Sequence, residues 1–467
     1  MKKPVAKVLI TAVAIGILIC LVIILSNRWN AKDRQPDEAY LSLLKEAYSA
    51  VTKSYVEQPD KEKTVLSMVN GMLASLDPHS AYLPPEPYKE MEVQISGSFG
   101  GVGIELGMRD NRLTVIAPID DTPAYRAGIQ ANDHIWKIDG TLTRGMTIAD
   151  AVKRMRGEKG TPVSLSILRT DTPKPLTFNL VRDTIKIKSL RSRLIEPGIG
   201  FIRIAQFQER TGIDFRQALK DLAITNNGPL KGLVIDLRFN PGGVIGPCIE
   251  VANCFIGDDI ANTLIVSTKG RMPAANHQYH ATLGTKEPRY PIVVLINGGS
   301  ASASEILAGA LQDHKRAVIM GKQSFGKGSV QSIFPMKGNA ALKLTTARYY
   351  TPSGRSIQAK GIVPDILVDS VKPKPVAHGG EGDVKEKDLT NRLAPDNKAE
   401  GSKTKGTVGE PAGNAETKAS SKEGEKQTEK EKPLLDAEVA KDYQLTRAVE
   451  LLRSLEMVRT LGGVVTR

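Results

Sequence analysis

Residues 297–306 read Asn-Gly-Gly-Ser-Ala-Ser-Ala-Ser-Glu-Ile. They follow the apolar run Ile292–Ile296, which is typical of a buried strand, and the pattern after them predicts a helix over Ser304–Gln312. A serine at such a strand-to-helix turn is exposed, and its small neighbours let a substrate backbone approach closely. The N–H of Ala303 would point from the helix N-terminus at a developing oxyanion beside Ser302. A small-residue turn packed under a sheet is the alternative interpretation.

A second glycine-rich stretch offers the base that a nucleophilic serine needs. Residues 324–331 read Ser-Phe-Gly-Lys-Gly-Ser-Val-Gln. A lysine has an ordinary pKa of about 10.4, so burial must lower the pKa of Lys327 before this side chain can accept a proton at neutral pH. The glycines on both sides of Lys327 allow another chain segment to approach closely. A hairpin lysine in water is the alternative.

Other bases and cofactors find less support. None of the six histidines stands in a hydrolase signature. Gly321, Gly326 and Lys327 match the spacing of a phosphate-binding loop, but Gly328 replaces the serine or threonine that would hold magnesium. A strand-like pattern follows instead of a helix, so we expect no nucleotide cofactor.

A third glycine-rich turn also follows a buried strand. Residues 236–243 read Asp-Leu-Arg-Phe-Asn-Pro-Gly-Gly. Paired glycines leave backbone N–H groups uncovered, so Gly243 or Gly242 would give a second oxyanion donor. A tight strand-to-helix turn without such a role is the alternative.

The chain around these stretches divides by its hydrophobic pattern. Residues 183–370 alternate short apolar strands with helices, which predicts an α/β core. Residues 96–182 are rich in strands and begin with a glycine-rich loop, which predicts a compact β-rich module. Residues 36–95 predict N-terminal helices, with a break at the proline-rich residues 83–87. The expected class is therefore a multi-domain α/β protein.

The two ends of the chain have a different character. In residues 1–35, lysines precede the uncharged run Val8–Leu25, which as a helix would reach about 27 Å, close to the thickness of a hydrocarbon core. No small-residue cleavage site follows the run, so we expect an uncleaved signal anchor, with a cleaved signal peptide as the alternative. Residues 371–433 are highly charged and lack aromatic residues, which predicts a disordered linker. Residues 434–467 predict a C-terminal amphipathic helix.

The overall composition fits this division. The 467 residues leave room for about three domains, and 40% hydrophobic with 25% charged residues exclude a wholly disordered protein. The net charge of +13 is not gathered into one arm or helix, so we expect no nucleic-acid partner. Three cysteines, Cys20, Cys248 and Cys254, exclude a disulfide framework. The spacing of Cys248 and Cys254 puts them on different sides of a helix, where they should be packed thiols.

Together these stretches resemble the carboxy-terminal processing proteases, also called tail-specific proteases. The resemblance spans roughly residues 36–370 and the last helix, and its specific feature is the order of a PDZ-like module, the serine loop and then Gly-Lys-Gly. It implies a PDZ-like β-rich module before an α/β serine peptidase core of the crotonase or Clp type. The residues that carry it are Phe99–Ile104, Asn240–Gly243, Ser300–Ile306, Ala308–Asp313 and Phe325–Gln331.

The resemblance also implies roles for single residues. Ser302 would be the nucleophile, Lys327 its base and Gln331 the group that orients the lysine. Ala303 and Gly243, or Gly242, would supply the oxyanion N–H groups. The family works without metal or nucleotide, so the resemblance implies an endopeptidase that needs no cofactor.

The PDZ-like module would recognise the substrate. Its loop residues Gly101, Val102, Gly103 and Ile104 would hold the C-terminal carboxylate of a protein substrate, and the strand beside them would pair with the substrate tail. The family cuts proteins near their C-termini in the periplasm or another extracytoplasmic space. We therefore expect attachment to the inner membrane through the N-terminal segment, or secretion to the periplasm if that segment is cleaved. A homo-oligomer or an adaptor protein is left open.

Two other classes compete with this interpretation. One is a PDZ scaffold with an inactive protease domain, against which Ser302, Lys327 and Gln331 all argue because they are intact. The other is an acyl-CoA hydratase-like enzyme, whose fold also offers oxyanion turns but lacks a PDZ module and has no use for a serine–lysine pair.

Overall fold

The computed structural model describes residues 38–170, 172–257, 262–284, 286–370, 385–389, 391–393 and 441–465. The expected signal anchor at residues 1–35 lies outside them. Most of the expected linker at 371–433 also lies outside, and disorder there stays a prediction. Among the helices that are described, none has the length and apolar character of a membrane span.

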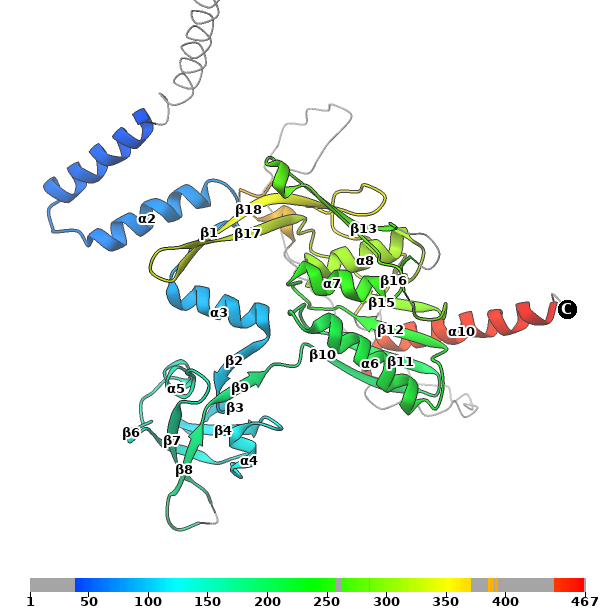
Figure 1. The fold of residues 1–467 in the computed structure, drawn as a ribbon, viewed down its shortest axis with the longest axis horizontal. Helices are drawn as coiled ribbons and strands as arrows, with labels where there is room; N and C mark the ends of the chain where they lie inside the picture. Colours follow the sequence, from blue (N-terminus) through cyan, green and yellow to red (C-terminus); the bar gives the residue numbers. More distant parts are fainter. Residues whose placement is uncertain are drawn as a thin grey trace, which may run out of the picture. The chain divides into compact units, whose positions relative to one another are not determined.

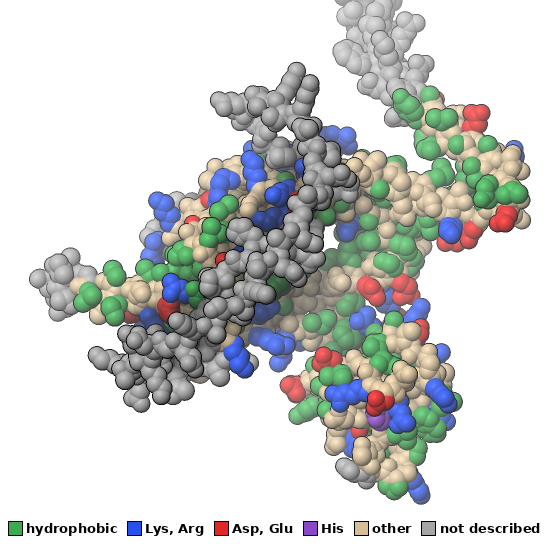
Figure 2. Space-filling view, turned by 180° about the vertical axis from the view of Figure 1, so that it is seen from behind, with side chains coloured by type: hydrophobic (Ala, Val, Ile, Leu, Met, Phe, Trp, Pro, Cys, Tyr) green, Lys and Arg blue, Asp and Glu red, His purple; other side chains and the backbone are tan. Residues whose placement is uncertain are grey.

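The expected N-terminal helices are present and belong to a compact unit that ends at Ser75. The first covers residues 38–54, and the second is α2 (Lys61–Ala74), where the Asp60 side chain accepts a hydrogen bond from the N–H of Lys63. In α2 only Leu73 is buried. Figure 2 shows hydrophobic side chains on the surface of these helices, which therefore owe little of their stability to a core of their own.

The next helix corrects one expectation. We expected the proline-rich residues 83–87 to break the chain, but α3 (Pro85–Ser96) begins inside them. Proline fits the first turn of a helix because the N–H that it lacks would have no partner there. Helix α3 ends at Gly97, whose φ of +66° is typical of a C-cap glycine.

The β-rich module is built on an antiparallel sheet. Its short strand β6 (Thr141–Leu142) pairs with β5 (His134–Ile138) alone. Its hydrophobic core is formed by alternate residues of the strands and by the buried side of helix α5 (Ile148–Met155), whose N-terminus is capped by Thr147. A separate pair, β2 (Ser98–Gly101) and β9 (Asp183–Lys186), lies where the chain enters and leaves the module. The main sheet has the order β3 (Ile104–Arg109), β4 (Arg112–Pro118), β5 (His134–Ile138), β7 (Pro162–Leu168) and β8 (Leu176–Val181).

The α/β core is a six-stranded sheet covered on both faces, with its five C-terminal strands parallel (Figure 1). In β15, Ile292, Val294 and Ile296 face one hydrophobic core, while Val293 and Leu295 face the other. Burial on both faces explains why these strands read as continuous apolar runs. The strands in order are β10 (Leu190–Glu196), β11 (Ile199–Ile204), β12 (Gly232–Asp236), β15 (Ile292–Ile296), β16 (Val318–Gly321) and β19 (Ile366–Leu367).

The two faces are covered by different helices. On one face pack α6 (Thr211–Thr225), α7 (Ile245–Asn253) and α8 (Ala303–Asp313), and on the other packs α10 (Tyr443–Val465), within the expected C-terminal helix. Cys248 and Cys254 are free and buried, as their spacing predicted. A second sheet carries the long hairpin of the lysine stretch and consists of β1 (Ala81–Leu83), β18 (Ala340–Tyr350), β13 (Leu264–Gly270), β14 (His277–His280) and β17 (Ser329–Met336).

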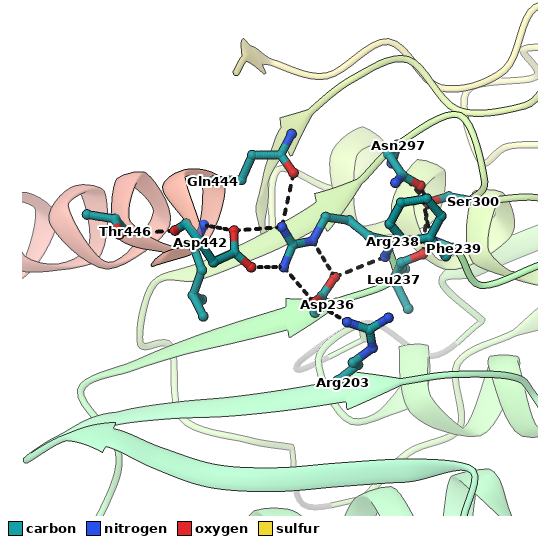
Figure 3. Close-up of polar contacts among 11 residues, drawn as sticks. Arg203, Asp236, Leu237, Arg238, Phe239, Asn297, Ser300, Asp442, Gln444 and Thr446 are labelled. Carbon is teal, nitrogen blue, oxygen red and sulfur yellow. Dashed lines mark hydrogen bonds and ion pairs between the residues drawn. The ribbon is translucent and has the colours of Figure 1, made fainter. Parts of the chain in front are cut away.

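A buried arginine fastens α10 to the end of β12 (Figure 3). The Arg238 guanidinium donates hydrogen bonds to both carboxylate oxygens of Asp236 at 2.8–2.9 Å and to both of Asp442 at 2.6–2.9 Å. It also donates to Gln444 Oε1 at 3.0 Å, and Gln444 donates to the carbonyl of Val368. The start of the C-terminal helix is thereby tied to the chain just before the turn at Asn240–Gly243.

We predict that Asp442→Asn lowers the free energy of unfolding by about 1–3 kcal/mol, because a buried cation loses one of its two anionic partners. Burial opposes ionisation of Asp442, but the hydrogen bonds and charge of Arg238 outweigh it and lower the pKa of Asp442. The stabilisation is therefore present above about pH 4 and should be lost as the pH falls further. Urea denaturation at pH 7 and at pH 3 measures both effects.

The matched control is Glu450→Gln, which removes an exposed ion pair with Arg447 on the same helix. Such a pair contributes about 0–1 kcal/mol. Equal losses in the two variants would show that the arginine does not fasten the helix.

Candidate active site

The structure separates the three serines of the turn after β15. The Ser300 hydroxyl donates to the carbonyl of Leu237 at 2.8 Å, and the Ser304 hydroxyl donates to the carbonyl of Asn240 at 3.0 Å (Figure 3 shows the first). Both side chains are fully buried, so they fasten the serine turn to the neighbouring turn after β12. Ser302 is only partly buried. Of the three hydroxyls, that of Ser302 is thus the one placed to meet a substrate.

The backbone of Ser302 is strained. Its φ of +54° and ψ of −113° lie outside the regions that a residue with a side chain normally adopts, at an expected cost of about 1–3 kcal/mol. The conformation is held on both sides: the N–H of Ser302 donates to Glu305 Oε2 at 2.8 Å, and the N–H of Ala301 donates to the carbonyl of Asn240 at 3.0 Å. A strained serine between a strand and a helix is the arrangement of a nucleophile elbow.

One buried carboxylate joins the serine turn to the lysine loop. Glu305 is fully buried in α8, and its Oε2 accepts hydrogen bonds from the backbone N–H groups of both Ser302, at 2.8 Å, and Lys327, at 2.9 Å. Its Oε1 accepts from the Ser324 hydroxyl at 2.5 Å and from the N–H of Gly326 at 2.7 Å. The backbone nitrogens of Ser302 and Lys327 therefore lie within two hydrogen-bond lengths of each other, although they are 25 residues apart in the sequence.

Two opposing effects act on the pKa of Glu305. Burial raises the pKa of Glu305 to about 7, while the four hydrogen bonds that it accepts lower the pKa. All four groups are donors, so the arrangement is fully satisfied only when the carboxylate is ionised. The sequence analysis gave Glu305 no role, yet it is the only charged residue in the run Ala303–Leu311, which is otherwise small or apolar and is buried throughout. A single charged residue in such a run was the feature of the sequence that could have indicated a role for Glu305.

The environment of Lys327 weakens its hold on a proton. Burial is the largest cause that lowers the pKa of Lys327, and the positive charge of Lys343 lowers it further. The carboxylates of Glu386, Glu305 and Asp77 act in the opposite direction, but the pKa remains below the ordinary value for lysine. A partly buried lysine with a lowered pKa can serve as a general base.

The predicted orienting residue Gln331 lies on β17 and points to other partners. Its amide donates to the Ser329 hydroxyl at 2.8 Å and to the Thr345 hydroxyl at 3.4 Å. Within the described residues, no hydrogen bond joins Lys327 Nζ to Ser302 or to Gln331. The role of Gln331 therefore stays a prediction.

The two glycines that the sequence left open differ in their hydrogen bonds. The N–H of Gly242 donates to Asn240 Oδ1 at 2.8 Å, whereas within the described part of the chain the N–H groups of Gly243 and Ala303 have no partner. A side chain at Gly242 would come within 2.8 Å of Ser302 Cβ, so this close approach requires glycine. The N–H groups of Gly243 and Ala303 are thus free to donate, whereas that of Gly242 is not, and their predicted oxyanion role stays a prediction.

The loop expected to hold a carboxylate also has backbone donors without a partner among the described residues. Gly101, Val102, Gly103 and Ile104 run from β2 into β3, and within the described residues the N–H groups of Val102 and Gly103 have no partner. Gly103 has a φ of +78°, and a side chain there would overlap Thr122. Strand β3 lies at the edge of its sheet, where an added strand could pair with it.

An α/β core with a strained serine and a partly buried lysine, preceded by a small β-rich module, defines a class: serine-type peptidases with a PDZ domain. Residues 198–368 match peptidase family S41, and residues 100–180 match the PDZ domain. The carboxy-terminal-processing protease of Bartonella bacilliformis is 47% identical over 354 residues, which cover 76% of this chain and 80% of that protein. The chain belongs to the carboxy-terminal processing proteases of family S41.

Two further proteins are also similar to this chain. The carboxy-terminal processing protease CtpB of Bacillus subtilis is 36% identical over 340 residues, which cover 72% of this chain and 69% of that protein. The solved photosystem II D1 C-terminal processing protease is 29% identical, covers 70% of this chain and 92% of its own, and superposes with a TM-score of 0.40. The expected fold class and the expected peptidase activity are thereby confirmed from the sequence relatives.

We predict that Glu305→Gln lowers kcat by about 10-fold or more, because a small displacement of reacting groups is costly. A glutamine has one acceptor oxygen for four donors, and its NH₂ group would face an N–H, so both turns should relax. The unsatisfied donors should also lower the free energy of unfolding by about 1–3 kcal/mol. Steady-state peptide hydrolysis and urea denaturation measure the two effects.

Ser304→Ala is the matched control, because it removes one buried hydrogen bond from the adjacent residue of the same helix. The carbonyl of Asn240 keeps its second donor, the N–H of Ala301, so activity should change little. If Glu305→Gln were as active as Ser304→Ala, the carboxylate would have no part in placing the two loops.

Proposed function

We propose that this protein is an extracytoplasmic endopeptidase that cleaves protein substrates near their C-termini with a Ser302–Lys327 dyad. The observation that supports the proposal is the shared Glu305 oxygen, which accepts hydrogen bonds from the backbone N–H groups of the strained Ser302 and of Lys327. The extracytoplasmic location rests on the sequence of residues 1–35, which predicts a signal anchor. The PDZ domain would bind the substrate tail.

The reaction follows from the groups present. Neutral Lys327 takes the proton of the Ser302 hydroxyl, and Ser302 Oγ attacks the scissile carbonyl carbon. The N–H groups of Ala303 and Gly243 donate to the oxyanion that forms. Protonated Lys327 then donates to the leaving amine, and the lysine, neutral again, activates the water that hydrolyses the acyl-enzyme. Each step uses only protein groups and water.

A protease that meets many proteins needs its dyad to stay misaligned until a suitable tail binds. Catalytic hydrogen bonds are often long or misaligned before substrate binds. A bound tail can shift the enzyme towards an aligned state only by binding that state more tightly. We infer that tail binding by the PDZ domain gates the dyad as well as tethering the substrate.

We predict that Ser302→Ala and Lys327→Ala are equally inactive, and that the double variant is no worse, because a nucleophile and its base act as a unit. Circular dichroism should match the wild type in all three. Cleavage that survives in Ser302→Ala would move the nucleophile to another serine and end the dyad proposal.

We predict that amidation of a peptide's C-terminus weakens both its binding and its turnover, because the Val102 and Gly103 N–H groups then lose an anionic partner. Calorimetry and peptide hydrolysis with matched free-acid and amidated peptides measure this. Adding a separate free-acid peptide with an apolar tail should activate cleavage of a second substrate.

Competition without activation would leave tethering and exclude gating. Equal cleavage of the free-acid and amidated peptides would remove the carboxylate-binding role of the PDZ domain.

A further inference from the structure

A short piece of the expected linker packs against the lysine loop. Residues 385–389 are described, and they include the 3₁₀ turn η2 (Glu386–Asp388). The N–H of Glu386 donates to the carbonyl of Phe325 at 3.1 Å, and Lys385 Nζ donates to Gln323 Oε1 at 3.1 Å. Both partners belong to the loop that leads into Lys327. Residues 385–389 therefore contact the loop that carries Lys327.

The side chain of Glu386 completes a hydrogen-bond chain to the same loop. Although it comes from a highly charged stretch, Glu386 is fully buried. Its carboxylate accepts from His79 Nε2, at 2.8 and 3.0 Å, and from Gln358 Nε2 at 2.9 Å. Gln358 Oε1 in turn accepts from the N–H of Gly328 at 3.1 Å, and Gly328 directly follows Lys327. The Glu386 carboxylate is therefore joined to the lysine loop through a single side-chain amide, that of Gln358.

We propose that Glu386 is a positioning residue of the active site, which holds the lysine loop through Gln358 and places a fixed negative charge near Lys327. This inference rests on the proposed Ser302–Lys327 dyad. It gives residues 385–389 a role in catalysis, although the composition of the linker alone predicts only disorder.

The charges around Lys327 give the proposal a direction. The charged groups that face this lysine are Lys343 of β18, Glu305 of α8, Asp77 and Glu386. Lys343 lowers the pKa of Lys327 beyond the effect of burial, whereas Glu386 and the other carboxylates raise it. A base that must also return its proton to the leaving amine works best with a pKa near the working pH. Glu386 therefore keeps Lys327 from becoming too weak a base to take the proton of Ser302 in the first step.

Glu386 itself is charged over the relevant range. Burial opposes its ionisation, but hydrogen bonds from His79 and Gln358 outweigh burial, so the pKa of Glu386 is lowered. His79 is the titratable group in direct contact with it, and its backbone N–H is held by Asp77 at 2.8 Å. The negative charge near Lys327 is thus present at every pH at which the dyad would work.

The test is the pH dependence of kcat/KM for peptide hydrolysis by the full chain. Neutral Lys327 is the active form, so the rate falls on the acidic side as this lysine is protonated. Glu386→Gln keeps the acceptor oxygen but removes the charge, and it should move the acidic limb to lower pH by about 0.5–1 unit. Lys343→Gln removes a charge of opposite sign and should move the limb to higher pH.

The matched control is Asp388→Asn, which removes a carboxylate from the same turn. Asp388 is exposed and accepts from the N–H of Lys385, and it is not among the charges that act on Lys327. Its acidic limb should coincide with that of the wild type. Glu386→Asp, which keeps the charge, should also retain the wild-type limb even if kcat falls.

The outcomes separate this inference from the proposed function. An acidic limb that does not move in Glu386→Gln, with or without a lower kcat, overturns the role of Glu386 and leaves the dyad intact. Should that variant not fold, Glu386→Ala gives the same comparison. Full cleavage by Ser302→Ala would instead overturn the dyad, whatever Glu386 does.

Discussion

The carboxylate of Glu305 is the constraint on which the candidate site depends. It lies fully buried and accepts four hydrogen bonds, three of them from the backbone of the serine turn and the lysine loop. Burying an anion is costly unless donors surround it. Separation of the two loops would take donors away from the buried carboxylate and is therefore unfavourable. The strained backbone of Ser302 is stable for the same reason, because its N–H is one of those donors.

The two sheets bring these loops together from opposite sides. The parallel sheet ends in the turns after β12 and β15, which supply Gly243 and Ser302, and the buried hydroxyls of Ser300 and Ser304 fasten one turn to the other. In the second sheet, β17 begins at Ser329, two residues after Lys327. Arg238 and Glu386 then attach two segments from the C-terminal part of the chain. Arg238 holds α10 next to the turn at Asn240–Gly243, and Glu386 holds residues 385–389 against the lysine loop.

Local pattern in the sequence indicated the parts of the candidate site that lie within one turn. A buried strand followed by small residues and a helix indicated Ser302, and glycines flanking a lysine indicated Lys327; the resemblance rested on both. The sequence could not distinguish Gly242 from Gly243, because the difference is a hydrogen bond to the Asn240 side chain. It also missed the contacts of Arg238 with Asp442 and of Glu386 with His79, which join residues more than 200 positions apart. Composition predicted disorder for the stretch that includes Glu386, since a single buried anchor leaves no compositional trace.

The most direct test of the account is the protonation of Lys327 itself. Protein labelled with ¹³C at the lysine ε-carbons can be titrated by NMR, with the Lys327 signal assigned by its loss in Lys327→Arg. Burial and Lys343 predict that Lys327 titrates below the ordinary lysine range and at the same pH as the acidic limb of kcat/KM. A Lys327 signal that titrates near pH 10.4 with the exposed lysines would contradict the account, since a lysine protonated at neutral pH cannot take the proton of Ser302.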